Sequence, residues 1–274
     1  HKICESIDKE GEQLENYTKY KLKEHDELVS VLADKDNLFI IACNKCFKEF
    51  ETIDEPDCGE FEKIVAEQGK NVVGTAKVDF LCNKVQTEKK LQDMIPDGAE
   101  NIFVISCGLG IQTVADLAGK PVFAASNSLN YTGHHGMALT KKSCDACAQC
   151  YLNITGGICP IVDCSKSLVN GQCGGAKNGK CEVDGEKDCA WEKIYRRLEK
   201  QGRLQEFLDQ PVQVRDYSKV NFKVVQDYVK SIRENRLDGY YGGVHPSERK
   251  EFSEHLALER FPEPQTVVIP LSQH

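Results

Sequence analysis

Eight cysteines crowd into one short stretch of the chain, and they are the residues best suited to do chemistry. The stretch opens as CDACAQCYLNITGGICPIVDC, and the full spacing is C-x2-C-x2-C-x8-C-x4-C-x8-C-x7-C-x7-C. The thiols are Cys144, Cys147, Cys150, Cys159, Cys164, Cys173, Cys181 and Cys189. Thiols at such spacing serve in disulfides, in zinc sites, in iron–sulfur clusters or as catalytic nucleophiles.

Two iron–sulfur clusters account for this pattern best. Eight thiols make two sets of four, and each [4Fe–4S] cluster binds four thiolates. The C-x2-C-x2-C triple also opens the cysteine run of bacterial ferredoxins, which ends in Cys-Pro. Here Cys159 and Pro160 supply that pair at a longer spacing. We therefore expect two [4Fe–4S] clusters on the eight cysteines, and the spacing leaves open which four share a cluster.

The other uses of cysteine fit this stretch less well. Zinc ribbons bring two separated C-x2-C pairs, whereas this stretch has a triple followed by single cysteines. Disulfide frameworks belong mostly to secreted proteins, and the first residues, HKICESIDKE, contain no apolar run typical of a signal peptide. No thiol is set apart with a neighbouring base, as a nucleophile requires. Zinc stays open as the second possibility.

A second set of cysteines follows predicted strands. Cys43 ends the apolar run NLFIIAC and precedes Cys46, Cys82 ends NVVGTAKVDFLC, and Cys107 follows NIFVIS. Because the carboxyl ends of parallel strands line one edge of a sheet, where ligands bind, we expect these four thiols to converge. Four thiolates suit zinc or a third [4Fe–4S] cluster, and buried cysteines without metal are the plain alternative. Cys58 fits no spacing and is kept as a reserve ligand.

Short apolar runs alternate with helical patterns between residues 36 and 127. The runs predict strands buried on both faces, and the alternation predicts a parallel sheet with right-handed crossovers. The fold class is therefore α/β: a small Rossmann-like parallel sheet, then an irregular cysteine-rich cluster-binding segment and C-terminal helices. The expected ranges are N-terminal helices over 1–35, the α/β domain over 36–140, the cysteine-rich segment over 141–190 and helices over 191–238.

The bulk composition fits a globular protein without a nucleic-acid partner. Charged residues make up 28% and hydrophobic residues 40% of the 274 residues, and the formal net charge is -8. An acidic chain is not drawn to nucleic acids or to anionic membranes. No apolar run approaches the roughly 20 residues that cross a bilayer. We therefore expect no membrane span and a cytoplasmic location.

The cysteine stretch and the following CAWEKIYRRLEKQGRL resemble a known family. They are similar to the small cysteine-rich subunit of the two-component methylenetetrahydrofolate reductase of acetogenic bacteria (MetV), and the similarity extends over about residues 36 to 210. The resemblance implies iron–sulfur clusters, zinc and a separate flavin-bearing TIM-barrel subunit (MetF) that reduces the folate. We expect the folate chemistry on that partner and no catalytic residue in this chain.

The last residues resemble a different family. From GYYGGVHPSERKEF to PEPQTVVIPLSQH, residues 239–274 are similar to the opening of the Rnf complex C subunit. That similarity implies the start of a further module from a family that receives electrons from NADH. The NADH-binding glycine loop of the family lies past the matching residues, so it is not carried over to this chain.

Together these features predict an electron-transfer subunit of an oxidoreductase, methylenetetrahydrofolate reductase. Electrons would pass from an NADH-oxidising module through the clusters to the flavin subunit, which reduces methylenetetrahydrofolate to methyltetrahydrofolate. The alternative is a zinc-stapled structural adaptor without a redox role. Metal content and visible absorbance separate the two functions, because a cluster protein is brown and a zinc protein is colourless.

Overall fold

Four parallel strands form a sheet in the order β3-β2-β4-β5, which confirms the predicted α/β fold. The computed structural model describes residues 18–44, 58–131 and 143–220. The strands are β2 (Leu38–Cys43), β3 (Val72–Val78), β4 (Asn101–Ile105) and β5 (Val122–Ala124). All six residues of β2 are buried, because the strand lies in the middle of the sheet with a helical layer on each face.

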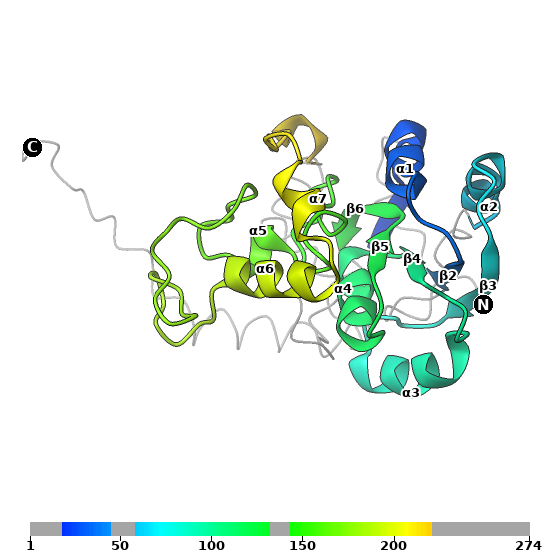
Figure 1. Cartoon of the computed structure of the whole chain (residues 1–274), viewed down its shortest axis with the longest axis horizontal. Helices are drawn as coiled ribbons and strands as arrows, with labels where there is room; N and C mark the ends of the chain where they lie inside the picture. Colours follow the sequence, from blue (N-terminus) through cyan, green and yellow to red (C-terminus); the bar gives the residue numbers. More distant parts are fainter. Residues whose placement is uncertain (1–17, 45–57, 132–142, 221–274) are drawn as a thin grey trace, which may run out of the picture. The chain divides into compact units, whose positions relative to one another are not determined.

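Two pairs of helices cover the two faces of this sheet (Figure 1). Side chains of α1 (His25–Leu32) and α2 (Cys58–Glu67) share one core cluster with Leu38, Ile40 and Ala42 of β2. Side chains of α3 (Lys84–Met94) and α4 (Gly108–Leu117) share the other with Phe39, Ile41 and Cys43. Alternate residues of β2 thus point to opposite faces, as the period of a strand requires.

A two-stranded antiparallel sheet joins the N-terminal part to the strand after β5. It pairs β1 (Thr18–Leu22) with β6 (Ser126–Tyr131). The prediction of helices throughout residues 1–35 is therefore wrong for Thr18–Leu22 and holds for α1, while residues 1–17 lie outside the described residues. The pairing partner is about a hundred residues away in the chain, so local apolar spacing does not reveal the strand.

The cysteine-rich segment has little regular structure, and helices follow it. Between residues 143 and 189 the only helix described is the short α5 (Pro160–Asp163). Then come α6 (Ala190–Lys200), α7 (Leu204–Leu208) and the 3₁₀ helix Tyr217–Lys219. Trp191, Ile194 and Leu198 of α6 form a small core with Ile158 and Cys189. The part of the predicted helical range 191–238 that follows residue 220 lies outside the described residues.

Hydrogen bonds and close packing attach the cysteine-rich segment to the sheet. The buried Asn153 side chain accepts from the backbone N–H of Ala124 at 2.6 Å and donates to the carbonyl of the same residue at 3.1 Å. Gly157 has φ +82, and a Cβ there would lie 2.3 Å from the Cβ of Ala115 in α4. Only glycine permits both the backbone conformation and this close approach.

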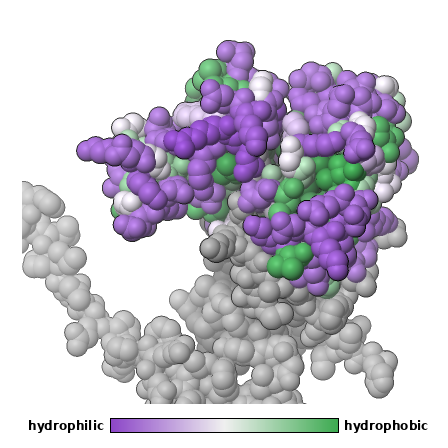
Figure 2. All heavy atoms as spheres, turned by 60° about the horizontal axis from the view of Figure 1, so that its bottom comes forward, coloured by the Kyte–Doolittle hydropathy of each residue, from purple (hydrophilic) through white to green (hydrophobic). Residues whose placement is uncertain are grey.

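The outer surface is mostly hydrophilic in the view of Figure 2, and hydrophobic side chains gather there in smaller areas. Such a surface agrees with the charged composition. Across the described ranges, no helix combines the length and apolar character needed to span a bilayer.

Candidate functional site

The carboxyl ends of β2 and β4 form the point where ligands bind in open α/β sheets. β2 lies between β3 and β4, and the helices that follow β2 and β4 pack on opposite faces. A crevice opens at such a switch in strand order. Cys43 is the last residue of β2, and Cys107 caps the N-terminus of α4 directly after β4. Both thiols therefore lie at this point, as the strand-end pattern predicted.

Cys82 reaches the same place from a turn rather than from a strand. β3 ends at Val78, so the prediction that this strand extends to Cys82 is wrong. The intervening turn contains Phe80 at φ 57, and it brings Cys82 into a cluster with Cys107 and Leu109. Cys46 lies outside the described residues.

Cys144 joins these strand-end thiols, which the sequence pattern did not predict. It packs against the cluster of Cys82 and Cys107. A Cβ on Gly108 would lie 2.7 Å from the Cys144 sulfur, so glycine at this position makes room for the thiol. Burial raises the pKa of Cys107 well above its ordinary value, and the nearby thiols of Cys43 and Cys82 raise it further. The strand-end set and the cysteine-rich segment therefore meet at Cys144.

The first four cysteines of the cysteine-rich segment surround one hollow, and we name them the first tetrad. They are Cys144, Cys147, Cys150 and Cys159, and they line the hollow together with Gly108, Gln112, Ser128 and residues 145, 148, 149, 151 and 152. The backbone N–H of Cys150 donates to the Asn127 side chain at 3.0 Å. The backbone N–H of Ala148 donates to the Ser128 carbonyl at 3.0 Å. The loop is thereby fixed along β6.

The backbone of the first tetrad is bent around its hollow. Ala146 and Ala148, which lie between the cysteines of the C-x2-C-x2-C triple, have φ 45 and φ 53. Non-glycine residues adopt this left-handed conformation only at a cost in free energy, and such strain gathers at functional sites. The two bends let three thiols of a short loop line the same hollow.

Burial disfavours the thiolate form of the deeper thiols in the first tetrad. It raises the pKa of Cys150 to about 12, while the charge of Lys23 and the backbone N–H of Leu152 act in the opposite direction. Burial also raises the pKa of Cys159, against hydrogen bonds from the N–H groups of Val162 and Ile161. The N–H groups on both sulfurs are the contacts that stabilise metal-bound thiolates.

The last four cysteines surround a second hollow, and we name them the second tetrad. They are Cys164, Cys173, Cys181 and Cys189, and they line the hollow together with residues 163, 165, 166, 172, 176, 182, 190 and 191. Cys189 is buried at the N-terminus of α6, whereas Cys173 is exposed. The eight cysteines thus divide in sequence order, four to each hollow, which the spacing alone left open.

Polar groups surround the second tetrad. The Ser165 hydroxyl, 3.6 Å from the Cys181 sulfur, lowers the pKa of Cys181, and the N–H of Val183 lowers it further. Cys173 lies 3.3 Å from a carboxylate oxygen of Glu182, which also pairs with Lys166. At Cys181, therefore, hydrogen bonds outweigh burial, whereas burial dominates at Cys150 and Cys159 of the first tetrad.

The donor set of each hollow suits a cluster or a soft metal ion. Four thiols line each hollow without a histidine, and thiolates are the ligands of [4Fe–4S] clusters and of structural zinc. The seven cysteines from Cys147 to Cys189 are thiols and form no disulfide. Within residues 18–44, 58–131 and 143–220, no three His, Cys, Asp or Glu side chains are placed closely enough to hold one metal ion.

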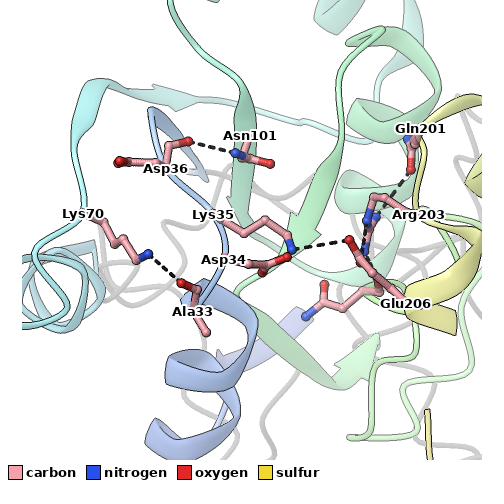
Figure 3. A network of polar contacts seen from close by, with 10 residues as sticks. Ala33, Asp34, Lys35, Asp36, Lys70, Asn101, Gln201, Arg203 and Glu206 are labelled. Atoms are coloured by element: carbon pink, nitrogen blue, oxygen red, sulfur yellow. Dashed lines mark hydrogen bonds and ion pairs between the residues drawn. The ribbon is translucent and has the colours of Figure 1, made fainter. Parts of the chain in front are cut away.

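A separate network of charged side chains holds α7 against the sheet (Figure 3). The ammonium of Lys35 lies 3.7 Å from Glu206 of α7 and also pairs with Asp34. The Arg203 guanidinium donates to the Asn153 carbonyl at 2.7 Å and lies over the Phe123 ring at 4.4 Å. This network positions the chain that follows the second tetrad and contains no cysteine.

Two family models match separate parts of the chain. Residues 123–218 match "Methylene-tetrahydrofolate reductase C terminal", and residues 239–274 match "RnfC Barrel sandwich hybrid domain". The first range contains both tetrads and begins after α4, so the strand-end cysteines Cys43, Cys82 and Cys107 lie outside it. The second range is the one for which the sequence predicted similarity to Rnf C, and it lies outside the described residues.

A curated relative agrees with the second match. It is the C component of an ion-translocating oxidoreductase complex from Edwardsiella ictaluri (strain 93-146), and it is 43% identical over 44 residues. Those residues are 16% of this chain and 6% of the relative. No solved structure matches the chain. The chain is therefore similar, in two separate segments, to two families of redox complexes.

Proposed function

We propose that this chain is the electron-transfer subunit of a methylenetetrahydrofolate reductase complex. Two [4Fe–4S] clusters, one held by each tetrad, relay electrons from an Rnf C-like NADH-oxidising module. The electrons pass to a flavin-bearing TIM-barrel subunit that reduces methylenetetrahydrofolate to methyltetrahydrofolate. The complex works in the cytoplasm, where thiols stay reduced.

The division of the eight thiols into two sets of four is the observation that carries this proposal. Each set lines its own hollow, and four thiolates are what one cubane cluster requires. Both sets lie inside the segment that matches the reductase C-terminal family. A similarity to Rnf C follows in the same chain, which supports an electron donor of that type.

In this proposal the residues of the chain bind the electron-carrying clusters and shield them from water. A bound [4Fe–4S] cluster supplies one-electron chemistry, and its potential depends on burial, on hydrogen bonds to sulfur and on nearby charge. Here the N–H groups of Leu152 and Val162 contact sulfurs of the first tetrad, and the Ser165 hydroxyl contacts Cys181. Asn127 and Asn153 fix the first loop to the sheet.

The strand-end thiols form a third site in this proposal. Cys43, Cys82 and Cys107 hold either zinc or a third [4Fe–4S] cluster, with Cys46 as the fourth ligand. Cys107 is the N-cap residue of α4. The backbone N–H of Gly110 favours its thiolate, while burial acts more strongly in the opposite direction and raises its pKa. Cys144 borders both this site and the first tetrad. A third cluster here would lengthen the electron path, and zinc would make the site structural.

The test is the content of iron, zinc and acid-labile sulfide per chain in anaerobically purified protein. Two clusters with a structural zinc give about eight irons and one zinc, and three clusters give about twelve irons. Cys147→Ser and Cys173→Ser should each remove about four irons, because each belongs to a different tetrad. Cys58→Ser is the matched control, since Cys58 lines neither hollow.

The functional test uses the assembled complex. Cys147→Ser should slow NADH-linked folate reduction and leave reduction of the flavin subunit by an artificial dye unaffected. Unchanged iron in both serine variants contradicts the cluster assignment. A wild-type chain that contains zinc but no acid-labile sulfide would contradict electron transfer. It would favour the alternative function, a zinc-stapled structural adaptor.

A further inference from the structure

Lys23 is a buried cation beside the first tetrad. It lies between β1 and α1, and its side chain is 1% exposed. Its backbone N–H donates to the Ala125 carbonyl at 2.9 Å, which fixes the residue at the edge of the sheet. The loss of hydration makes an ammonium costly to bury unless negative charge faces it. The groups around this ammonium therefore indicate where negative charge is expected.

The ammonium contacts the first tetrad on one side and a carboxylate on the other. It donates to the Cys150 carbonyl at 3.2 Å and pairs with a carboxylate oxygen of Glu27, whose side chain is 45% exposed. A half-exposed carboxylate is screened by water, so it compensates the buried charge only in part. Further negative charge on the tetrad side would complete the compensation.

We propose that Lys23 raises the reduction potential of the cluster held by Cys144, Cys147, Cys150 and Cys159. This inference rests on the proposed function. A cubane cluster with four thiolates is an anion, and it gains a further negative charge when it accepts one electron. No bond forms or breaks in that step, and no proton leaves Lys23. A fixed cation at short range stabilises the reduced anion more than the oxidised one, because Coulomb energy scales with the charge.

Lys35 supplies the matched control. It is another buried lysine of the same domain, with a side chain 9% exposed and ion pairs to Asp34 and Glu206. Its ammonium also lies 5.2 Å from the centre of the Phe123 ring. Figure 3 shows these partners on the loop before β2 and on α7. Loss of Lys35 therefore disturbs packing to a similar extent without removing a contact to a tetrad.

The experiment is a potentiometric titration of the full chain, reconstituted with iron and sulfide, read by electron paramagnetic resonance. A Cys173→Ser background leaves the first tetrad as the only complete one of the two. Lys23→Met should lower the equilibrium constant for one-electron reduction of its cluster about tenfold, which corresponds to about 59 mV. Lys23→Arg keeps the charge and should retain most of the wild-type potential, and Lys35→Met should leave it unchanged.

A second variant keeps the proposal testable if Lys23→Met fails to fold or to bind iron. Glu27→Gln removes the exposed counter-charge and leaves Lys23 in place, so it should shift the potential upward, opposite to Lys23→Met. An iron-loaded Lys23→Met or Glu27→Gln chain with the wild-type potential overturns the role of Lys23. A wild-type chain without iron and sulfide overturns the proposed function itself, before any lysine variant is measured.

Discussion

The loop of the first tetrad is hydrogen-bonded to the strands of the sheet domain, whereas the second tetrad is supported by α6 and by turns within its own loops. Asn127 and Asn153 bond the first loop to β5 and β6. The second tetrad has instead the indole N–H of Trp191, which donates to the Leu168 carbonyl at 2.9 Å, and short backbone turns such as Lys177 to Lys180. Two hollows that are each lined by four thiols are thus supported by different parts of the fold.

The two tetrads also differ in how negative charge is stabilised. Burial raises the pKa of Cys150 and Cys159, and the charge of Lys23 opposes this effect at Cys150. In the second tetrad the Ser165 hydroxyl and neighbouring N–H groups lower the pKa of Cys181. Backbone N–H groups favour thiolates in both tetrads, but a buried cation is added at Cys150 and a side-chain hydroxyl at Cys181. If both tetrads bind clusters as proposed, these differences should give the two clusters different reduction potentials.

The largest expected difference between the tetrads is in stability. Cys150→Ala should lower the free energy of unfolding of the metal-loaded chain by about 3 kcal/mol, because a lost metal group frees a loop that packs on the sheet. Cys173→Ala should lower it by about 1 kcal/mol, because the exposed thiol lies away from the sheet core. Anaerobic urea denaturation, followed by circular dichroism, measures both. Equal losses would contradict the different anchoring of the two tetrads.

The next effect is a difference in thiol reactivity in the metal-free chain. At pH 8 Cys181 should react with iodoacetamide at least about a hundred times faster than Cys150, because only the thiolate is nucleophilic. The rate at Cys181 should level off at a lower pH than for an ordinary thiol, since its pKa is lowered. The rate at Cys150 should keep rising with pH toward its pKa of about 12.

Peptide mapping by mass spectrometry gives both alkylation rates in one sample. The same measurement in urea is the control, because unfolding removes the burial and the hydrogen bonds that separate the two thiols. The rates should then agree within a few-fold. A similar rate at Cys150 and Cys181 in the folded chain would contradict the difference in burial between the tetrads.

The sheet and the division between regular and irregular segments could be predicted from the sequence. The apolar run at Leu38–Cys43 is a central strand buried on both faces, and such runs carry their own signal. The spacing at Thr18–Leu22 wrongly predicts a helix, because the strand partner Ser126–Tyr131 is remote in the chain. The predicted end of β3 is too late, since the turn at Phe80 with positive φ has no clear sequence signal.

The cysteines of the candidate sites could be predicted from the sequence, but which of them lie together in space could not. Strand ends predicted that Cys43 and Cys107 would lie together, because parallel strands share an edge. The position of Cys144 beside them depends on tertiary contacts, such as the Gln112 side chain donating to the Ser143 carbonyl at 2.8 Å. The burial of Lys23 beside the first tetrad could not be predicted from the sequence, since a lysine between a strand and a helix is ordinarily exposed.

A smaller effect is expected from the anchor of the first tetrad to the sheet. Asn153→Ala should lower the free energy of unfolding by about 2 kcal/mol, because it leaves the N–H and carbonyl of Ala124 without the bonds that Asn153 makes. Asn170→Ala is the matched control on the exposed side, where Asn170 bonds the backbone of Gln213. Its loss should cost about 0.5 kcal/mol or less, since water replaces the bonds. Equal losses in urea denaturation would remove the anchoring role of Asn153.

The smallest effect is expected from the charges around the second tetrad. Lys166 pairs with Glu182 at the surface, where both side chains are exposed by more than a third, so water and salt screen the pair. Lys166→Gln should therefore change the melting temperature by no more than about 1 °C. Its effect on the potential of the second cluster should likewise be far below that of Lys23→Met on the first, because water already surrounds the charge. A fall of several degrees, or a potential shift equal to that of Lys23→Met, would mean that surface charge matters as much as buried charge. The contrast between the two tetrads would then no longer hold.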